Sequence, residues 1–516
     1  MSHPGIHARA HPDKPAVTMA RRGDVVTYRE LEERSRRMAQ LMAARGLGVG
    51  DHVALLMEKN PRFYDISWAA QRSGMYFTPV NWHLSASEAG YIVENCGARC
   101  LVVSKAMEDV ARGLAEHTGK VDIRLMVDGI AEGYESYEKA VADYPAEPLE
   151  KETEGSFMFY SSGTTGRPKG IIRPLSGNPF GSELQMQFLV ELYEFDEHSV
   201  YLCPAPLYHA AAGGWSTMVQ RIGGTVILME SFDAVEALKL IERHRVTHAQ
   251  FVPTMFVRML NLPEEVRSRF DPSALRMVLH GAAPMSVAVK RRMIDWWGEV
   301  FVEYWGATEG GTTTLVDSAD WLAHPGTVGR ALPSFEVFAV DDRGERLPPG
   351  QEGILYCRHR HLRQVFEYHR APEQTAEAHP QPFLFNIGDI GRVDEDGYVY
   401  LSDRKSNMII SGGVNIYPAE IEQILQEHPA VADVGVFGIP DAEWGEAVKA
   451  AVELVPGRRP SPELEGELRA FAREHLADYK VPRSIDFENG LPRYPTGKLH
   501  VRLLRDRYWK HHDRSI

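Results

Sequence analysis

The sequence predicts an α/β protein: a large N-terminal domain with parallel and mixed sheets, helices and a small β-rich part, followed by a small α+β C-terminal domain. A chain of 516 residues exceeds a single typical core, so at least two domains are expected. Over most of the chain, short apolar segments alternate with helical patterns, which is typical of a parallel sheet covered by helices. Farther along, tight-turn sequences separate strand-like segments and indicate antiparallel hairpins.

The first elements follow from caps and apolar spacing. Thr27 and Glu30 form a capping box, and apolar residues at helical spacing continue to Gly46, so a helix is expected between these points. Strands are expected at residues 53–57, 76–80 and 101–103, with helices that begin near residues 60 and 87. Similar strand–helix units recur over residues 200–278, and Ser286 can cap a further helix.

The later elements follow from turn chemistry. Residues 341–344 and 394–397 are Asp- and Gly-rich turns between strand-like segments, so each predicts a hairpin. Pro418 suits the first turn of a helix whose apolar residues share one face. Strands at residues 434–437 and 447–454 and a helix near residues 463–476 complete a small α/β unit.

This change of pattern places the domain boundary near residues 403–406. The expected domains are an N-terminal core of residues 1–403 and a C-terminal domain of residues 404–516. The sequence shows no internal repeat and no long low-complexity linker between them.

Composition narrows the class of protein. A net charge of −14 argues against a general nucleic-acid binder, which needs a basic face. The four cysteines contain no C-x-x-C pair, and the chain shows neither a signal-peptide pattern nor an apolar segment of transmembrane length. We therefore expect a soluble, cytoplasmic protein with reduced thiols, either a monomer or a homodimer. His244 and His248 are four residues apart but lack an evident third ligand, so we expect no transition-metal site.

The most informative segment is residues 161–170, Ser-Ser-Gly-Thr-Thr-Gly-Arg-Pro-Lys-Gly. Its glycines, hydroxyl groups and Lys169 suit a phosphate cradle, and the apolar residues 157–160 predict a strand that leads into it. It is not a Walker A loop, because Pro168 precedes the lysine and Gly170 follows it. The alternative is a flexible surface loop.

Other segments resemble, in order, the motifs of the adenylate-forming superfamily, which contains acyl- and aryl-CoA synthetases, peptide-synthetase adenylation domains and luciferases. Besides the phosphate loop, they are Gly281-Ala282-Ala283-Pro284, the aromatic-Gly-x-Thr-Glu motif at residues 304–309, Gly388-Asp389 with Asp403-Arg404, residues 411–422, and Pro495-Thr496-Gly497-Lys498. The resemblance covers almost the whole chain and implies that the C-terminal domain is a mobile lid.

The resemblance implies a reaction in two steps. A carboxylate attacks the α-phosphate of ATP to give an acyl-adenylate and pyrophosphate, and the acyl group then passes to coenzyme A. Because the first step brings two anions together, Lys498 is expected to supply positive charge. Mg²⁺ is expected to arrive with ATP, with Thr164 and Glu309 as ligands.

The same resemblance implies roles for further residues. The expected phosphate-binding set is Ser161, Ser162, Gly163, Thr164, Thr165, Gly166 and Lys169. The expected adenine set is Gly281, Ala282, Ala283 and Gly306, with Tyr304 or Trp305 as the ring face. Thr308 is expected at the α-phosphate, and Asp389 at the ribose with Arg404 beside it.

The second step implies a rotated C-terminal domain with a pantetheine tunnel at Gly412 and Gly413. Trp444 resembles a CoA-adenine contact of some members, although an exposed packing tryptophan is the alternative. Ser406 occupies a hinge position at which relatives usually have Asp or Lys.

The sequence leaves two points open: which carboxylic acid is activated, and which molecule accepts the acyl group. Tyr208 and His209, a further catalytic candidate, precede Ala-Ala-Ala-Gly-Gly, which resembles the acyl-pocket stretch. Small side chains there favour a bulky hydrophobic acid, with medium or long chains, alicyclic acids or steroid side chains as examples; close helix packing is the alternative. The second hypothesis is an amide ligase that joins the activated acid to an amino acid, as coronafacate ligases do. The third is a nucleotide-sensing protein without catalysis.

Overall fold

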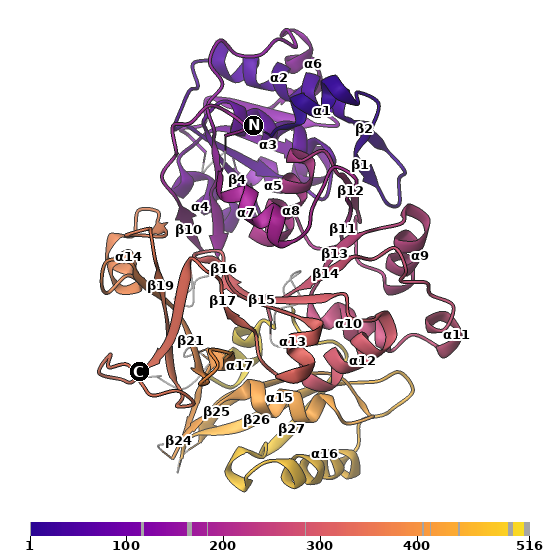
Figure 1. Cartoon of the computed structure of the whole chain (residues 1–516), viewed down its shortest axis with the longest axis vertical. Coiled ribbons are helices and arrows are strands. Elements are labelled where there is room, and N and C mark those ends of the chain that lie inside the picture. The colour runs from indigo at the N-terminus through magenta and orange to yellow at the C-terminus, as the bar shows by residue number, and fades with distance from the viewer. Residues whose placement is uncertain are drawn as a thin grey trace. The chain divides into compact units, whose positions relative to one another are not determined.

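The computed structural model describes residues 2–114, 118–161, 168–182, 184–283, 285–404, 407–412, 414–441, 444–493 and 499–509, with residues 184–187 and 404 by backbone alone (Figure 1). The chain divides into two compact units, of which the first comprises Met1–Gln250, Ser268–Val278 and Val365–Glu377, and the second Phe251–Arg267, Leu279–Gln364 and Ala378–Ile516. None of the helices in these ranges has the length and hydropathy of a bilayer-spanning segment.

The first unit contains a six-stranded parallel sheet in the order β7-β6-β5-β3-β4-β8. The strands are β3 (His52–Leu56), β4 (Tyr76–Val80), β5 (Ala98–Ser104), β6 (Ile123–Val127), β7 (Glu135–Ser136) and β8 (Ser156–Phe157). The helices are α2 (Tyr28–Ala44), α3 (Arg62–Arg72), α4 (Ala86–Cys96), α5 (Glu108–Leu114) and α6 (Tyr137–Ala142), and a 3-10 turn spans Lys105–Met107. The predicted capping box of Thr27 and Glu30 begins α2, and the three predicted strands are confirmed.

A second group of strands in this unit runs β13-β11-β12-β1-β2. These are β1 (Pro15–Met19), β2 (Val25–Thr27), β11 (Val200–Cys203), β12 (Thr225–Leu228) and β13 (His248–Phe251), with helices α1 (Pro4–Ala10), α7 (Leu184–Leu192), α8 (Ala210–Arg221) and α9 (Ala234–His244). β11, β12 and β13 are parallel, as the repeated strand–helix pattern predicts, whereas β2 adds an antiparallel edge.

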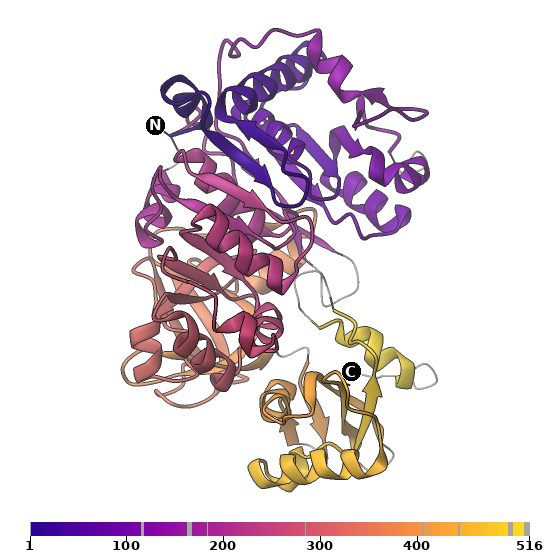
Figure 2. The ribbon, with the colours of Figure 1, turned by 90° about the vertical axis from the view of Figure 1, so that its right-hand side faces the viewer.

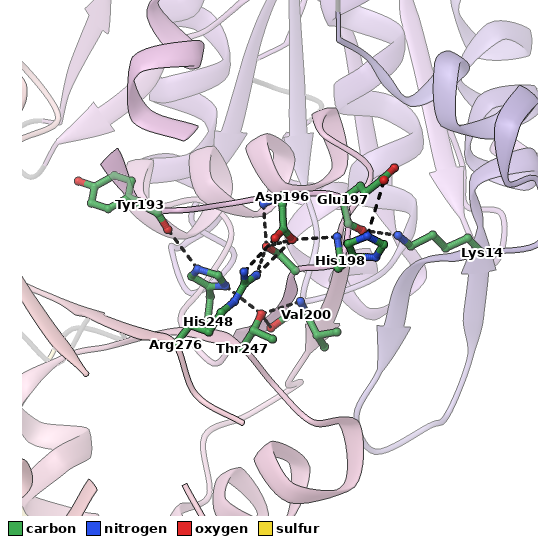
Figure 3. A network of polar contacts seen from close by, with 10 residues as sticks. Lys14, Tyr193, Asp196, Glu197, His198, Val200, Thr247, His248 and Arg276 are labelled. Atoms are coloured by element: carbon green, nitrogen blue, oxygen red, sulfur yellow. Dashed lines mark hydrogen bonds and ion pairs between the residues drawn. The ribbon is translucent and has the colours of Figure 1, made fainter. Parts of the chain in front are cut away.

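Polar contacts join the loops around β11 and β13 (Figure 3). Arg276 donates to both carboxylate oxygens of Asp196, at 2.9 and 3.2 Å. The two ring nitrogens of His248 contact Thr247 Oγ1 at 2.9 Å and the Tyr193 carbonyl at 3.1 Å. His248 is fully buried with both nitrogens engaged, so its role here is structural.

A small antiparallel sheet in the order β20-β10-β9 completes the first unit. It consists of β9 (Phe159–Ser161), β10 (Lys169–Ile172) and β20 (Glu367–Tyr368), and α14 (Pro372–Ala378) follows. Strands β9 and β10 flank the predicted phosphate loop.

The second unit is mainly antiparallel in its strands. β15 (Phe301–Ala307) pairs with β16 (Gly311–Asp317), which pairs with β17 (Arg330–Ala331). A four-stranded sheet follows in the order β18-β19-β21-β22, formed by β18 (Phe335–Val340), β19 (Gly353–His359), β21 (Leu384–Val393) and β22 (Val399–Arg404). The predicted turns at residues 341–344 and 394–397 lie between antiparallel partners of this sheet. The remaining elements are β14 (Met277–His280), α10 (Pro253–Leu260), α11 (Glu264–Arg267), α12 (Val287–Trp297) and α13 (Ser318–Ala323).

The C-terminal strands of this unit form a five-stranded sheet covered on both faces. The strands are β23 (Ile409–Ser411), β24 (Val414–Ile416), β25 (Val431–Asp441), β26 (Gly445–Leu454) and β27 (Ser484–Glu488). The helices are α15 (Pro418–Gln426), α16 (Pro462–His475) and α17 (Val501–Trp509), with a 3-10 turn at Asp478–Lys480. α15 and α16 pack on one face, with Leu468 in that core, and α17 packs on the other through Leu504; Figure 2 shows α16 in gold along the strands. The predicted α/β class with a small C-terminal α+β part is confirmed.

Candidate active site

The two ends of the predicted phosphate loop are paired with each other. Ser161 on β9 lies opposite Lys169 on β10 in an antiparallel register. The Lys169 ammonium lies 4.9 Å from the centre of the Tyr368 ring on β20, so a cation–π contact orients this charge. Ser162, Gly163, Thr164, Thr165 and Gly166 fall outside the described residues. The described residues on both sides of the loop are thus antiparallel strands, and the phosphate-binding role of the loop stays a prediction.

Two predicted adenine motifs lie together in the second unit. A side chain at Gly281 would have its Cβ 2.7 Å from the Tyr304 carbonyl oxygen and 2.8 Å from the Tyr304 ring, so only glycine allows this approach. Ala282 follows with a positive φ of 68°, which turns the chain sharply, and Ala283 comes next. Gly306 is equally constrained, because a Cβ there would collide with the Gly311 carbonyl. The turn at residues 281–283 is thereby fitted against the strand that carries Tyr304.

The predicted ribose-binding carboxylate is fixed by a tryptophan. The Trp305 indole N–H donates to Asp389 Oδ2 at 2.8 Å. The Trp305 side chain is 5% exposed and Asp389 6%, so this bond is shielded from water. In the β21–β22 register Asp389 lies opposite Arg404, whose side chain is outside the description. Trp305 therefore orients Asp389, which leaves Tyr304 as the more accessible ring of the two.

Thr308 and Glu309 lie in the connection between β15 and β16, and both are partly buried. Among the described residues, no group of three His, Cys, Asp or Glu side chains is arranged to hold a metal ion. A single protein carboxylate such as Glu309 fits Mg²⁺ that keeps most of its ligands as substrate phosphates and waters.

The start of α8 holds the predicted acyl-pocket residues. His209 is the N-cap of α8, and burial, followed by the charge of Lys59, lowers its pKa to about 3. It is therefore a neutral imidazole at physiological pH. Gly213 lies against the Leu207 backbone, which is the close-packing role that the sequence left open, whereas a Cβ at Gly214 would meet no atom within 4 Å. Only part of the small-residue stretch is thus explained by packing.

The C-terminal glycine loop contacts Trp444. Gly412 has a φ of 58°, and its N–H donates to the Trp444 carbonyl at 2.8 Å. A Cβ at Gly412 would collide with the indole, so the ring rests directly on this backbone. The Trp444 side chain is 42% exposed, and the Arg483 guanidinium lies 5.6 Å from its ring centre. Gly413 is outside the described residues.

Lys498 is also outside the described residues, but the chain on either side of it is well anchored. Arg493 and Leu499 form an antiparallel bridge. Arg493 donates to both carboxylate oxygens of Asp433 on β25, at 2.5 and 2.6 Å. The described residues on either side of the predicted catalytic segment are therefore paired with each other, and Arg493 is bound to β25.

Sequence motifs gave no indication of Lys59, which lies just after β3 and is only 7% exposed. Its ammonium donates to the carbonyl of Pro204, which follows β11. The only available signal was the charged pair Glu58-Lys59 directly after the apolar segment at residues 55–57. Lysines in such positions are usually exposed, so the sequence alone does not single it out.

Comparisons with known proteins show the family to which the chain belongs. A family model described as AMP-binding enzyme matches residues 6–366, and one described as AMP-binding enzyme C-terminal domain matches residues 420–498. A feruloyl-CoA synthase from Amycolatopsis sp is 35% identical over 98% of both chains. A fatty acid–[acyl-carrier-protein] ligase from Streptomyces coeruleorubidus is 33% identical over 99% of this chain and 96% of its own.

Solved structures agree as well. ATP-bound MatB from Rhodopseudomonas palustris has a TM-score of 0.82 at 28% identity, covering 99% of this chain and 100% of its own. The amide bond synthetase McbA from Marinactinospora thermotolerans has a TM-score of 0.81 at 28% identity, covering 98% and 99%. The chain thus belongs to the AMP-binding enzyme family, within the adenylate-forming superfamily that its motifs resemble.

Proposed function

We propose that this enzyme activates a carboxylic acid with ATP, forming an acyl-adenylate and pyrophosphate, and transfers the acyl group to coenzyme A with release of AMP. The observation that carries the first step is the second unit's nucleotide-side geometry: the Gly281 turn fitted against Tyr304, and Asp389 oriented by Trp305 at 2.8 Å. Tyr304, Trp305 and Asp389 lie on strands, and the Gly281 turn directly follows one, so these groups are preorganised for the adenosine half of ATP.

The chain's own groups account for the charges of the first step. In the proposal, Lys169 and the loop from Ser161 to Gly166 bind the leaving pyrophosphate, Thr308 bonds the α-phosphate, and Lys498 lies between that phosphate and the carboxylate. No proton has to move in this step, so positioning and positive charge are sufficient. Mg²⁺, held by Glu309 and Thr164 when bound with ATP, would neutralise phosphate charge.

His209 has a narrower role in this proposal than general base. A buried imidazole whose pKa is lowered to about 3 is a weak proton acceptor at neutral pH. We assign it to the wall of the acyl pocket, where a neutral ring can pack and accept or donate one hydrogen bond.

We also propose that residues 1–403 and 404–516 act as the core and the mobile lid. Asp403, the last residue before this boundary, accepts from the Ala419 N–H at 3.0 Å and from Asn407 Nδ2 at 3.2 Å. These bonds join the core side of the proposed boundary to Asn407 and to the start of α15 on the lid side. A rotation of the lid about residues 404–406, which include Ser406, therefore has to break them.

The choice of acceptor rests on Trp444. A half-exposed indole beside the Arg483 guanidinium offers a ring face and a cation, which together suit a nucleotide. CoA ligases for ferulate, long-chain fatty acids and 2-succinylbenzoate are among the relatives. The structural likeness to an amide bond synthetase keeps an amine acceptor as the second candidate. Small molecules as partners and a cytoplasmic location remain part of the proposal.

The experiment offers the purified enzyme a panel of carboxylic acids with ATP and Mg²⁺. Pyrophosphate release identifies the acids that are activated. Coenzyme A, amino acids and simple amines are then supplied separately, and products are identified by mass spectrometry. Acyl-CoA as the main product supports the proposal, amide products favour the second candidate, and absence of acid-dependent pyrophosphate release overturns both.

A further inference from the structure

A small cavity lies at the carboxyl ends of β3 and β4 in the first unit. Most of its lining is apolar, with Leu55, Phe63, Pro79 and Leu207 as examples, and Lys59 and Tyr208 are among its polar lining residues. Tyr208 directly precedes α8, so the cavity adjoins the stretch assigned above to the acyl pocket. The carboxyl ends of parallel strands are the usual place for ligands in open α/β sheets.

Lys59 is a buried cation whose described hydrogen-bond partner is a backbone carbonyl. Its ammonium has three donors, and one of them bonds the Pro204 carbonyl. Within the described part of the chain, no carboxylate forms an ion pair with it. Glu58, which also lines the cavity, instead accepts from the Ser104 hydroxyl. Burial lowers the pKa of Lys59 to about 8, so most molecules still carry this charge at neutral pH.

Tyr208 and His209 add two more buried polar atoms. The Tyr208 hydroxyl and His209 Nε2 are shielded from solvent and have no hydrogen-bond partner among the described residues. Their rings lie 4.4 Å apart, and the Lys59 charge acts directly on the His209 ring. Buried polar groups are nearly always paired, so three incompletely satisfied ones in one place call for a ligand atom or a water.

We propose that Lys59, Tyr208 and His209 form a subsite for an oxygen atom on the acyl chain of the substrate, remote from the reacting carboxylate. Lys59 and Tyr208 supply donors, so the group they take is a hydrogen-bond acceptor: a phenol or hydroxyl, a ketone, or a second carboxylate. This inference rests on the proposed function and replaces a purely hydrocarbon acid with one that carries oxygen on its tail. A substrate with a hydrocarbon tail would leave the Lys59 and Tyr208 donors without a partner. The enzyme should therefore discriminate strongly against such a substrate.

The test uses pairs of acids that differ by one oxygen-bearing group. Suitable pairs are 4-hydroxycinnamate with cinnamate, and ω-hydroxy or ω-carboxy fatty acids with the plain fatty acids of equal length. The measured quantity is the ratio of kcat/KM for pyrophosphate release between the two members. In the wild type we expect the oxygenated member of at least one pair to be favoured about tenfold or more.

Two substitutions decide whether this subsite causes the preference. Lys59→Met keeps an unbranched side chain one atom shorter and removes the charge, and Tyr208→Phe removes only the hydroxyl. Each should lower kcat/KM for the favoured acid much more than for its partner, bringing the ratio toward one. Lys239→Met, at an exposed position on α9, should keep the wild-type ratio.

The outcomes separate this proposal from the one on which it rests. Equal use of both members in every pair, or a ratio unchanged in Lys59→Met, overturns the subsite while the ligase function stands. If no acid of either kind releases pyrophosphate, the ligase function fails. The subsite is then decided by calorimetric binding of the same acids to the wild type and to Lys59→Met: tighter wild-type binding of oxygenated acids supports it, and equal binding overturns it.

Discussion

Lys59 in the first unit and Lys290 in the second are both buried, and their surroundings are opposite. Lys290 on α12 donates to Glu303 on β15 at 2.5 Å, and its ammonium lies 4.7 Å from the centre of the Trp321 ring. Lys59 in the first unit has the same side chain at a similar depth, but its described partner is one backbone carbonyl. A buried cation with a counter-ion inside the protein serves the fold, whereas a buried cation whose described partner is one carbonyl has donors left for a ligand.

This difference has an energetic consequence. Burial lowers the pKa of both lysines, and for Lys290 the ion pair with Glu303 opposes this shift. Within the described part of the chain no ion pair opposes it for Lys59, whose pKa is lowered to about 8. A buried cation of this kind lowers the free energy of unfolding, and destabilising features of this kind are typical of functional sites.

The largest expected effect comes from breaking the paired lysine. Glu303→Gln leaves the Lys290 charge buried without its counter-ion, so the free energy of unfolding should fall by about 3–5 kcal/mol. Urea unfolding measures this loss. The double variant Lys290→Met with Glu303→Leu removes both charges and should recover most of it. Equal losses in the single and double variants would mean that packing, not the ion pair, determines stability here.

The second prediction concerns the pH dependence of the unpaired lysine. The pKa of Lys59 is about 8 when folded and near its ordinary 10.5 when unfolded. Between these values the unfolded chain binds more protons, so Lys59 makes stability rise with pH across this window, by up to about 3 kcal/mol. Below pH 8 both states are protonated and the full burial cost is present.

The measurement is the difference in unfolding free energy between the wild type and Lys59→Met at several pH values. As the pH rises from about 8 to 10.5, the wild type should gain stability relative to Lys59→Met. The other titratable groups are the same in both proteins, so their contributions cancel in this difference. A difference that does not change with pH would contradict the burial of a charged Lys59.

A third lysine should affect rate and not stability. Lys498→Ala removes positive charge from the proposed adenylation step, and losing one such group commonly costs about a hundredfold or more in rate. Pyrophosphate release should fall accordingly, while ATP affinity and the urea midpoint stay near the wild-type values. Lys239→Ala is the exposed control. Wild-type pyrophosphate release by Lys498→Ala would show that another group supplies this charge.

Features that depend on local chain geometry were the most accessible from the sequence. Gly281 and Gly412 were expected at a ligand loop, and each allows a close approach that a Cβ would prevent. The sequence could not predict that Trp305 would bond Asp389, because these residues are far apart in the chain and meet only through the fold. Lys59 was missed for the same reason: its burial depends on a carbonyl after β11, and no local pattern encodes that contact.

The smallest expected effect is at Trp444, where an exposed cation and ring face solvent. Stacking of a base on an aromatic ring is worth roughly 1–3 kcal/mol, so Trp444→Ala should raise the KM for CoA about tenfold. The KM for ATP and the rate of pyrophosphate release should not change, because Trp444 plays no part in the first step of the proposal. Arg483→Met keeps the indole and removes the cation beside it, so its effect on the KM for CoA should be smaller. If the KM for CoA is unchanged in Trp444→Ala, this tryptophan only packs against Gly412. An amine would then become the favoured acceptor of the second step.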